Sequence, residues 1–167
     1  MTLLGTRIEG ARVLDLFAGS GALGFECLSR DAVQVIAIER DRGALETIRR
    51  NAADLALDED EFRVVRGDAY RPRAKGPFDI VFVAPPYPQF RSAGHRVRRL
   101  TGEVGADLAD GAVIVVQAGT GDFHGDGLPG LVVSDERRYG ITTFWFLEPA
   151  PAADADTPSE ADTLSAE

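Results

Sequence analysis

Hydrophobic residues in the first half of the chain fall into two alternating patterns. Short runs that are apolar nearly throughout predict buried β-strands, and apolar residues at helical spacing between them predict α-helices. The predicted strands cover residues 12–17, 33–39, 62–66 and 78–83, and the predicted helices cover residues 21–29 and 41–55. This alternation is typical of an α/β fold, in which helices cover both faces of a parallel sheet.

The second half of the chain departs from this alternation near its end. We predict a helix within residues 97–108 and a strand at residues 112–117. The next two apolar runs, residues 131–134 and 141–147, are joined by a polar turn at residues 135–140, which is too short for a crossover helix. The pattern predicts an α/β, Rossmann-like, doubly wound and mostly parallel sheet of seven strands, with an antiparallel C-terminal hairpin at one edge.

Composition predicts one domain followed by an acidic tail. A chain of 167 residues with 44% apolar content can bury one sizeable core, which we place in residues 1–148. Residues 149–167 lack the apolar side chains needed to offset ordering entropy, so we expect them to be disordered. The net charge of −9 argues only weakly against a nucleic-acid partner, because outside residues 148–167 the chain has 18 basic and 21 acidic side chains.

No apolar stretch approaches the roughly 18 to 20 residues that a membrane span needs, and no basic and then apolar leader opens the chain. We therefore expect a cytoplasmic protein without membrane contact. The only cysteine, Cys27, cannot form an internal disulfide, and its apolar neighbours indicate a small buried residue. His124 has no partners at metal-ligand spacing, and we predict no metal site.

A glycine-rich segment follows the first predicted strand and predicts a nucleotide-type ligand. Gly19, Gly21 and Gly24 have GxGxxG spacing, which allows a tight turn and lets a ligand approach the backbone at a helix N-terminus. Glu39 ends the second strand, where a carboxylate can accept hydrogen bonds from ribose hydroxyls. These features fit a dinucleotide as well as S-adenosylmethionine.

Two further carboxylates favour S-adenosylmethionine. Asp15 precedes the glycines on the first strand, where an acid suits a cationic amino-acid group better than a pyrophosphate. Asp68 and Ala69 follow the third strand, where the carboxylate suits the amino group of adenine. Asp68 can also be read as a helix or turn cap.

Ala84-Pro85-Pro86-Tyr87 directly follows the strand at residues 78–83, a placement typical of enzymes that methylate amino groups of nucleic-acid bases. An exocyclic amine is a poor nucleophile, and two hydrogen-bond acceptors must hold it for attack while an aromatic side chain stacks on the base. Pro85 can supply a backbone carbonyl and Tyr87 the stacking face. Ala84 has no side-chain acceptor, a loss that costs about 10²–10³ in rate by analogy with oxyanion holes.

Three segments, in this order and spacing, resemble the bacterial RsmD-type family, which methylates the N2 amine of a guanine in small-subunit (16S) ribosomal RNA. They are GARVLDLFAGSGALGFECLSRDA, FDIVFVAPPY and RRYGITTFWF, and the similarity covers about residues 3–147. The resemblance implies S-adenosylmethionine as the cofactor and ribosomal RNA or the small ribosomal subunit as the partner, and no obligate protein partner is evident. The implied cofactor-binding residues are Asp15, Phe17, Gly19, Gly21, Glu39, Asp68 and Ala69, and the implied target-base residues are Ala84, Pro85, Pro86 and Tyr87.

The chain departs from the family pattern at two places. Ala84 stands where the family has an acid. Family members also carry some tens of residues before the first strand, including a helix that helps to cover the active site, whereas the segment starting at Met1 resembles only the end of that helix. We therefore expect part of this cover to be missing.

Basic residues follow two of the candidate site segments and are candidates for RNA contacts. They are Arg91, His95, Arg96, Arg98 and Arg99 after Tyr87, and Arg71, Arg73 and Lys75 after Asp68. An ordinary solvated surface explains any one of these residues equally well. The cluster from Arg96 to Arg99 beside Tyr87 favours phosphate binding.

Other functions remain open at this point. The chain can be a catalytically impaired remnant of the family that still binds S-adenosylmethionine and RNA, a reading that Ala84 supports. A DNA adenine methyltransferase shares the site but normally needs a separate target-recognition region. An NAD-dependent oxidoreductase fits GxGxxG and Glu39 but leaves the Pro-Pro-Tyr segment unexplained.

Overall fold

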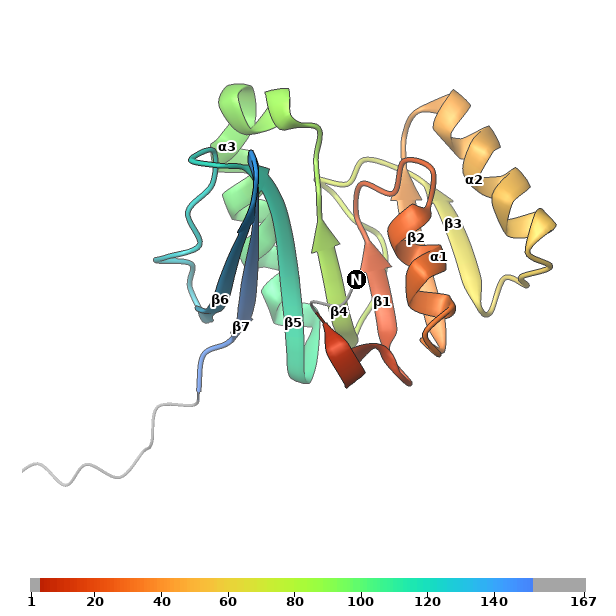
Figure 1. Cartoon of the computed structure of the whole chain (residues 1–167), viewed down its shortest axis with the longest axis horizontal. Helices are drawn as coiled ribbons and strands as arrows, with labels where there is room; N and C mark the ends of the chain where they lie inside the picture. Colours follow the sequence, from red (N-terminus) through yellow and green to blue (C-terminus); the bar gives the residue numbers. More distant parts are fainter. Residues whose placement is uncertain (1–3, 152–167) are drawn as a thin grey trace, which may run out of the picture.

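The computed structural model of the chain describes residues 4–151, so most of the predicted acidic tail lies outside the described residues. Seven strands form one sheet in the order β3-β2-β1-β4-β5-β7-β6 (Figure 1). The strands are β1 (Arg12–Asp15), β2 (Gln34–Glu39), β3 (Phe62–Arg66), β4 (Phe78–Val83), β5 (Leu108–Gly119), β6 (Leu131–Tyr139) and β7 (Thr142–Pro149). The helices are α1 (Ala22–Leu28), α2 (Arg42–Asp54) and α3 (Tyr87–Val104), with 3₁₀-helices η1 (Gly5–Ile8) and η2 (Gly105–Asp107).

Strands β1 to β5 are parallel, and only the C-terminal hairpin runs against them. β1 lies between β2 and β4, with β3 outside β2 and β5 outside β4. β7 pairs antiparallel with both β5 and β6, which leaves β6 at the edge. This arrangement confirms the predicted Rossmann-like sheet. The strand order reverses between β1 and β4, and ligands of such sheets bind at the carboxyl ends of the strands at this switch point.

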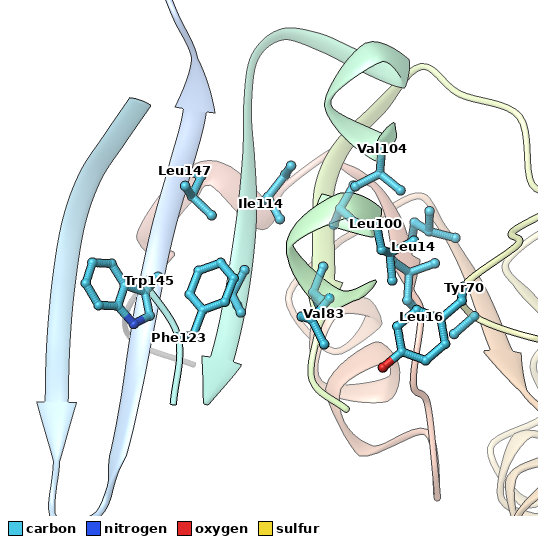
Figure 2. Close-up of a cluster of buried hydrophobic side chains, with 14 of the residues drawn as sticks. Leu14, Leu16, Tyr70, Val83, Leu100, Val104, Ile114, Phe123, Trp145 and Leu147 are labelled. Carbon is cyan, nitrogen blue, oxygen red and sulfur yellow. The ribbon is translucent and has the colours of Figure 1, made fainter. Parts of the chain in front are cut away.

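Each face of the sheet has its own buried core. On one face η1, α1 and α2 pack through Ile8, Cys27 and Ile48 against side chains such as Val13 and Phe82. On the other face α3 contributes Leu100 and Val104, which lie with Leu14 in the cluster that Figure 2 shows. The same cluster extends across the hairpin, where Phe123 and Trp145 meet edge to face at 6.1 Å.

The helix predicted within residues 97–108 begins ten residues earlier than expected, and that prediction was wrong at its start. α3 begins at Tyr87, directly after the Pro-Pro pair, with Pro88 in its first turn. Proline is favoured there because the first amides of a helix need no intrahelical acceptor. The backbone leaves helical geometry at Ala93, and this kink breaks the apolar periodicity that a sequence pattern relies on.

The polar turn predicted at residues 135–140 was also wrong. Asp135–Tyr139 belongs to β6, and the hairpin turns at Gly140 and Ile141, where Gly140 has a φ of +59°. β6 is an edge strand with one face in solvent. Its polar residues therefore do not form the continuous apolar run from which a buried strand is predicted. Tyr139 and Ile141 are consequently exposed at the hairpin tip.

Two smaller expectations concern membranes and the cysteine. Among residues 4–151, no helix has the length and apolar character required to cross a bilayer. Cys27 is fully buried in α1, as predicted. Burial raises the pKa of its thiol to about 12, and the charges of Asp15 and Glu26 add to the rise. A thiol of this kind is unreactive at neutral pH.

Candidate functional site

The GxGxxG segment forms a tight turn from β1 into α1. Gly19 and Gly21 have φ values of +55° and +83°, which side-chain-bearing residues rarely adopt. A Cβ at Gly24 would lie 2.8 Å from Val35 and 2.9 Å from Phe62, so this glycine lets α1 pack closely on the sheet. The three glycines therefore shape the backbone and the helix packing around one end of β1.

Glu39 organises the loop ends beside this turn. Its Oε2 accepts a hydrogen bond from the backbone amide of Gly19 at 2.8 Å. Its Oε1 accepts the amides of Arg40 at 2.7 Å and Asp41 at 2.8 Å. The carboxylate thus joins the end of β2 to the glycine turn after β1, and it remains partly exposed.

Asp15 is a buried carboxylate without a partner. Its exposed fraction is 1%, and neither carboxylate oxygen has a hydrogen-bond partner among residues 4–151. Burial raises the pKa of Asp15 to about 7; the Phe17 amide, although outside ordinary hydrogen-bond geometry, opposes this rise, and the charge of Glu39 adds to it. Unpaired buried carboxylates are rare, and they occur where a ligand or a charge is to be received.

A cleft of about 670 Å³ opens where β1, β2, β3 and β4 end. Its volume is in the range of sites for cofactors and drug-sized ligands. Four loop segments line it: Leu16, Phe17 and Gly19 after β1; Glu39, Arg40 and Asp41 after β2; Gly67 to Tyr70 after β3; and Ala84 and Pro86 after β4. The switch point of the sheet therefore coincides with a cleft of cofactor size.

Asp68 and Tyr70 form the wall of the cleft after β3. Asp68 accepts the amide of Tyr70 at 3.1 Å, a turn-capping bond of the kind considered from the sequence, and its second oxygen lies 4.0 Å from Arg96. The Arg96 guanidinium lies 4.2 Å from the centroid of the Tyr70 ring. The Tyr70 hydroxyl donates to Gln89 at 2.9 Å, which ties this wall to α3.

The segment from Ala84 to Tyr87 lies between β4 and α3 at the cleft edge. The Pro86 carbonyl accepts the Gln89 amide at 2.8 Å, and the Pro85 carbonyl makes no such loop or turn bond within residues 4–151. The Tyr87 hydroxyl lies 2.6 Å from the Thr142 hydroxyl at the start of β7. The C-terminal hairpin thus fixes the orientation of the Tyr87 ring.

The model of the family described as Conserved hypothetical protein 95 matches residues 2–148. The chain belongs to this family. Curated relatives include the putative rRNA methyltransferase YlbH of Bacillus subtilis, 39% identical over 90 residues, which are 51% of this chain and 48% of the relative. Ribosomal RNA small subunit methyltransferase D of Escherichia coli is 46% identical over 82 residues, or 48% of this chain and 40% of the relative. The matched segments span about half the length of these relatives or less, and the relatives' names confirm the RsmD-type family predicted from the motifs.

Solved structures of similar proteins cover more of the chain. A putative methyltransferase of Escherichia coli, yhhF, has a TM-score of 0.75 and 32% identity over 87% of this chain and 80% of that one. A putative methylase of Haemophilus influenzae has a TM-score of 0.74 and 26% identity over 89% of this chain and 92% of that one. The RsmD-type chain therefore has the Rossmann-like fold of methyltransferases.

The RsmD-type fold gathers most of the predicted cofactor residues at the cleft, but two lie outside its lining. Asp15 and Gly21 are buried and do not line the cleft. Pro85 and Tyr87 flank the cleft without lining it. Tyr70, Gln89 and Arg40 line it and were not singled out from the sequence, although Tyr70 directly follows Asp68 and Ala69.

The predicted RNA-contacting arginines on α3 differ in how they are used. Arg98 donates to the carbonyl oxygens of His124 and Asp126 and so holds the loop before β6. Arg99 pairs with Glu103 one helical turn away, and Arg91 lies 3.6 Å from Asp122. Arg96 is exposed at the mouth of the cleft. No group of three or more His, Cys, Asp and Glu side chains within residues 4–151 is arranged to hold a metal ion.

Proposed function

We propose that this chain transfers a methyl group from S-adenosylmethionine to the N2 amine of a guanine in small-subunit ribosomal RNA. One observation carries the proposal: the cleft that the glycine turn, Glu39 and Asp68 line is continued by Ala84 and Pro86 of the Pro-Pro-Tyr segment. Residues proposed to bind the cofactor therefore line one cavity together with Ala84 and Pro86 of the predicted amine-methylating motif. Family membership and the names of the relatives support the same reaction.

The residues present fit S-adenosylmethionine. Of the residues that line the cleft, Glu39 suits the ribose hydroxyls, and Asp68 with Ala69 suits the adenine ring. Asp15 does not line the cleft, but its buried carboxylate, which has no hydrogen-bond partner within residues 4–151, suits the cationic amino group. A Cβ at Gly19 would meet no atom within 4 Å, so the backbone of the turn is open to a ligand. When bound, the cofactor supplies an electrophilic methyl group on a sulfonium centre.

The target base has its own set of residues. Tyr87, whose hydroxyl contacts Thr142, offers an aromatic face on which an extruded guanine stacks. The Pro85 carbonyl accepts one hydrogen from the N2 amine, which localises the nitrogen lone pair for attack. Arg96 at the cleft mouth, together with Arg91 and Arg99, attracts phosphates of the RNA backbone.

The decisive experiment is transfer of labelled methyl from S-adenosylmethionine to small ribosomal subunits that lack the modification, followed by mapping of the labelled base. Label at a single guanine N2 is the expected result. Label on another base or on ribosomal protein contradicts the proposal. Subunits that already carry the modification provide the control, because they should accept no label.

Ala84 favours a second candidate, a remnant that binds S-adenosylmethionine and RNA without efficient transfer. Calorimetric binding of S-adenosylhomocysteine to the same preparation separates the two candidates. Binding with transfer supports the enzyme, whereas binding without transfer supports the remnant. A large gain on Ala84→Asp would place the defect at the missing acceptor.

A further inference from the structure

A second, small pocket adjoins the cofactor cleft at Ala84. Its volume is about 30 Å³, enough for an amino group and too small for a purine ring. Ala84 lines both this pocket and the cofactor cleft. Seven other residues line it, all apolar except one: Leu4, Leu23, Phe82, Val115, Gln117, Phe144 and Phe146. The pocket therefore adjoins the proposed cofactor cleft at the position where the RsmD-type family has an acid.

Gln117 is the polar side chain of this pocket, and the sheet register places it next to Ala84. Val83 of β4 pairs with Val116 of β5, so the following residues, Ala84 and Gln117, are neighbours across parallel strands. Because both line the pocket, their side chains share one face of the sheet. On the other side, Gln117 pairs with Phe144 of β7, which limits the directions open to its side chain.

The amide of Gln117 is available to a ligand. The residue is only partly buried. The polar side-chain contacts around the two cavities within residues 4–151 include those that join Glu39 to Gly19, Tyr70 to Gln89 and Tyr87 to Thr142, and none of them uses the Gln117 amide. A glutamine side chain is long enough to cross one strand spacing of about 4.8 Å and reach the space above Ala84.

We propose that the side-chain oxygen of Gln117 replaces the acceptor missing at position 84 and binds one hydrogen of the target amine. This inference rests on the proposed function. Together the Gln117 oxygen and the Pro85 carbonyl hold the two amine hydrogens, so the nitrogen lone pair faces the cofactor cleft. A carboxamide oxygen is a neutral hydrogen-bond acceptor, as the Pro85 carbonyl oxygen is.

The chemical step balances without a charged base. The amine nitrogen forms a bond to the methyl carbon as the carbon–sulfur bond breaks, and the bonding electron pair stays on sulfur. The positively charged product nitrogen then releases one proton to water. Gln117 is neutral and takes no proton, so its contribution is to orient the amine and to stabilise the partial positive charge that develops on it.

The test compares four proteins: the unaltered chain, Gln117→Leu, Ala84→Asp and the double variant. Single-turnover methyl transfer to unmodified small subunits is measured beside the Kd for S-adenosylhomocysteine and thermal unfolding. We expect Gln117→Leu to slow transfer about 100- to 1,000-fold, as loss of one preorganised hydrogen bond does in oxyanion holes, with Kd unchanged. In the double variant the carboxylate that Ala84→Asp introduces restores the rate to within a few-fold, which a merely structural role of Gln117 does not predict.

Two controls separate the amide from its surroundings. Gln117→Glu keeps an acceptor oxygen and should retain more activity than Gln117→Leu. Gln34→Leu removes a glutamine that binds Arg12 at the opposite ends of β1 and β2, and it should leave the transfer rate unchanged.

Each remaining outcome decides against the inference. A Gln117→Leu rate within twofold of the unaltered chain overturns it. An inactive chain that becomes active with Ala84→Asp overturns it while supporting the proposed function, because Gln117 is then no substitute. No transfer by either protein, despite bound cofactor analogue, overturns the proposed function and the inference with it.

Discussion

The two halves of the sheet differ in how their ligand-facing ends are built. The cofactor half, β1 to β3 with α1 and α2, surrounds its cleft with carboxylates, and Glu39 is held by three backbone amides. The half that comprises β4 to β7 and α3, which we call the target half after its proposed substrate, contributes Ala84 and Gln117 to a pocket whose other lining side chains are apolar. Figure 1 shows the halves side by side, with α3 behind the target half and α1 in front of the cofactor half.

This difference suggests that cofactor binding and methyl transfer depend on different halves of the sheet. The cofactor half keeps the cofactor-binding residues that the resemblance to the RsmD-type family implies, so we expect binding of S-adenosylmethionine to tolerate most changes in the target half. The target half carries the departure at Ala84, and its catalytic geometry depends on contacts between strands that are distant in sequence. We therefore expect substitutions to affect methyl transfer more than cofactor binding.

The largest expected effect is a gain in stability when Asp15, the buried acid of the cofactor half, is replaced by Asn. Asp15 has a folded-state pKa of about 7 against an ordinary value of 3.8, so the folded chain holds a proton that the unfolded chain has lost. The bound proton makes its full contribution to the free energy of unfolding below pH 3.8. That contribution is lost as the pH rises through 7 and the folded chain must bury a charged carboxylate. At pH 8, Asp15→Asn should raise the free energy of unfolding of the unliganded chain by up to about 4 kcal/mol.

Urea denaturation between pH 4 and 8 measures this effect. The advantage of Asp15→Asn should shrink as pH falls and vanish near pH 4. Asp110→Asn, at an exposed position on β5, should show no such trend. A difference between Asp15→Asn and the unaltered chain that does not vary with pH would mean that the carboxylate is not buried as the structure places it.

The next effect tests the cofactor half through Glu39. Glu39→Ala removes the acceptor of the Gly19, Arg40 and Asp41 amides and the proposed partner of the ribose. Loss of charged hydrogen bonds worth about 1.5–3 kcal/mol each should weaken S-adenosylhomocysteine binding about 100-fold. Calorimetry measures it, and Glu26→Ala, which breaks only an exposed pair with Arg30, is the matched control. Equal Kd values of the two variants for S-adenosylhomocysteine would show that Glu39 does not contribute to cofactor binding.

A smaller effect tests the target half through Tyr87. Tyr87→Ala should lower the methyl-transfer rate about tenfold or more, because stacking of a base on an aromatic ring is worth about 1–3 kcal/mol. Tyr87→Phe keeps the ring and loses only the contact with Thr142, so its rate should fall by no more than about threefold. Equal losses in the two variants would show that the hydroxyl, not the ring, matters.

The smallest effect concerns the charges at the cleft mouth. Arg96→Gln should weaken RNA binding a few-fold and reduce the slope of log affinity against log salt by about 1. Filter binding at several salt concentrations measures both quantities. Arg30→Gln, which removes an exposed ion pair with Glu26 of α1, should change neither the affinity nor the salt slope. An unchanged salt slope for Arg96→Gln would exclude a phosphate contact by this residue.

The contrast between the halves also decided what could be predicted from the sequence. Local patterns sufficed for the cofactor half, where buried parallel strands, the glycine spacing and Glu39 follow one another within a short segment. In the target half the start of α3 was missed because the kink at Ala93 interrupts its periodicity. The polar part of β6 was taken for a turn because an edge strand is not constrained to be apolar.

The sequence by itself determined the fold class, the family and the absence of an acid at position 84, because each can be recognised from residues that are close together in the chain. Only the tertiary structure decided that the Asp15 carboxylate has no hydrogen-bond partner within residues 4–151 and that Gln117 lies beside Ala84 in a shared pocket. Those facts depend on the register between strands and on which face a side chain occupies. Register is set by packing of the whole sheet. The alternation of side chains within one strand does not identify which residue of the adjacent strand lies beside a given residue.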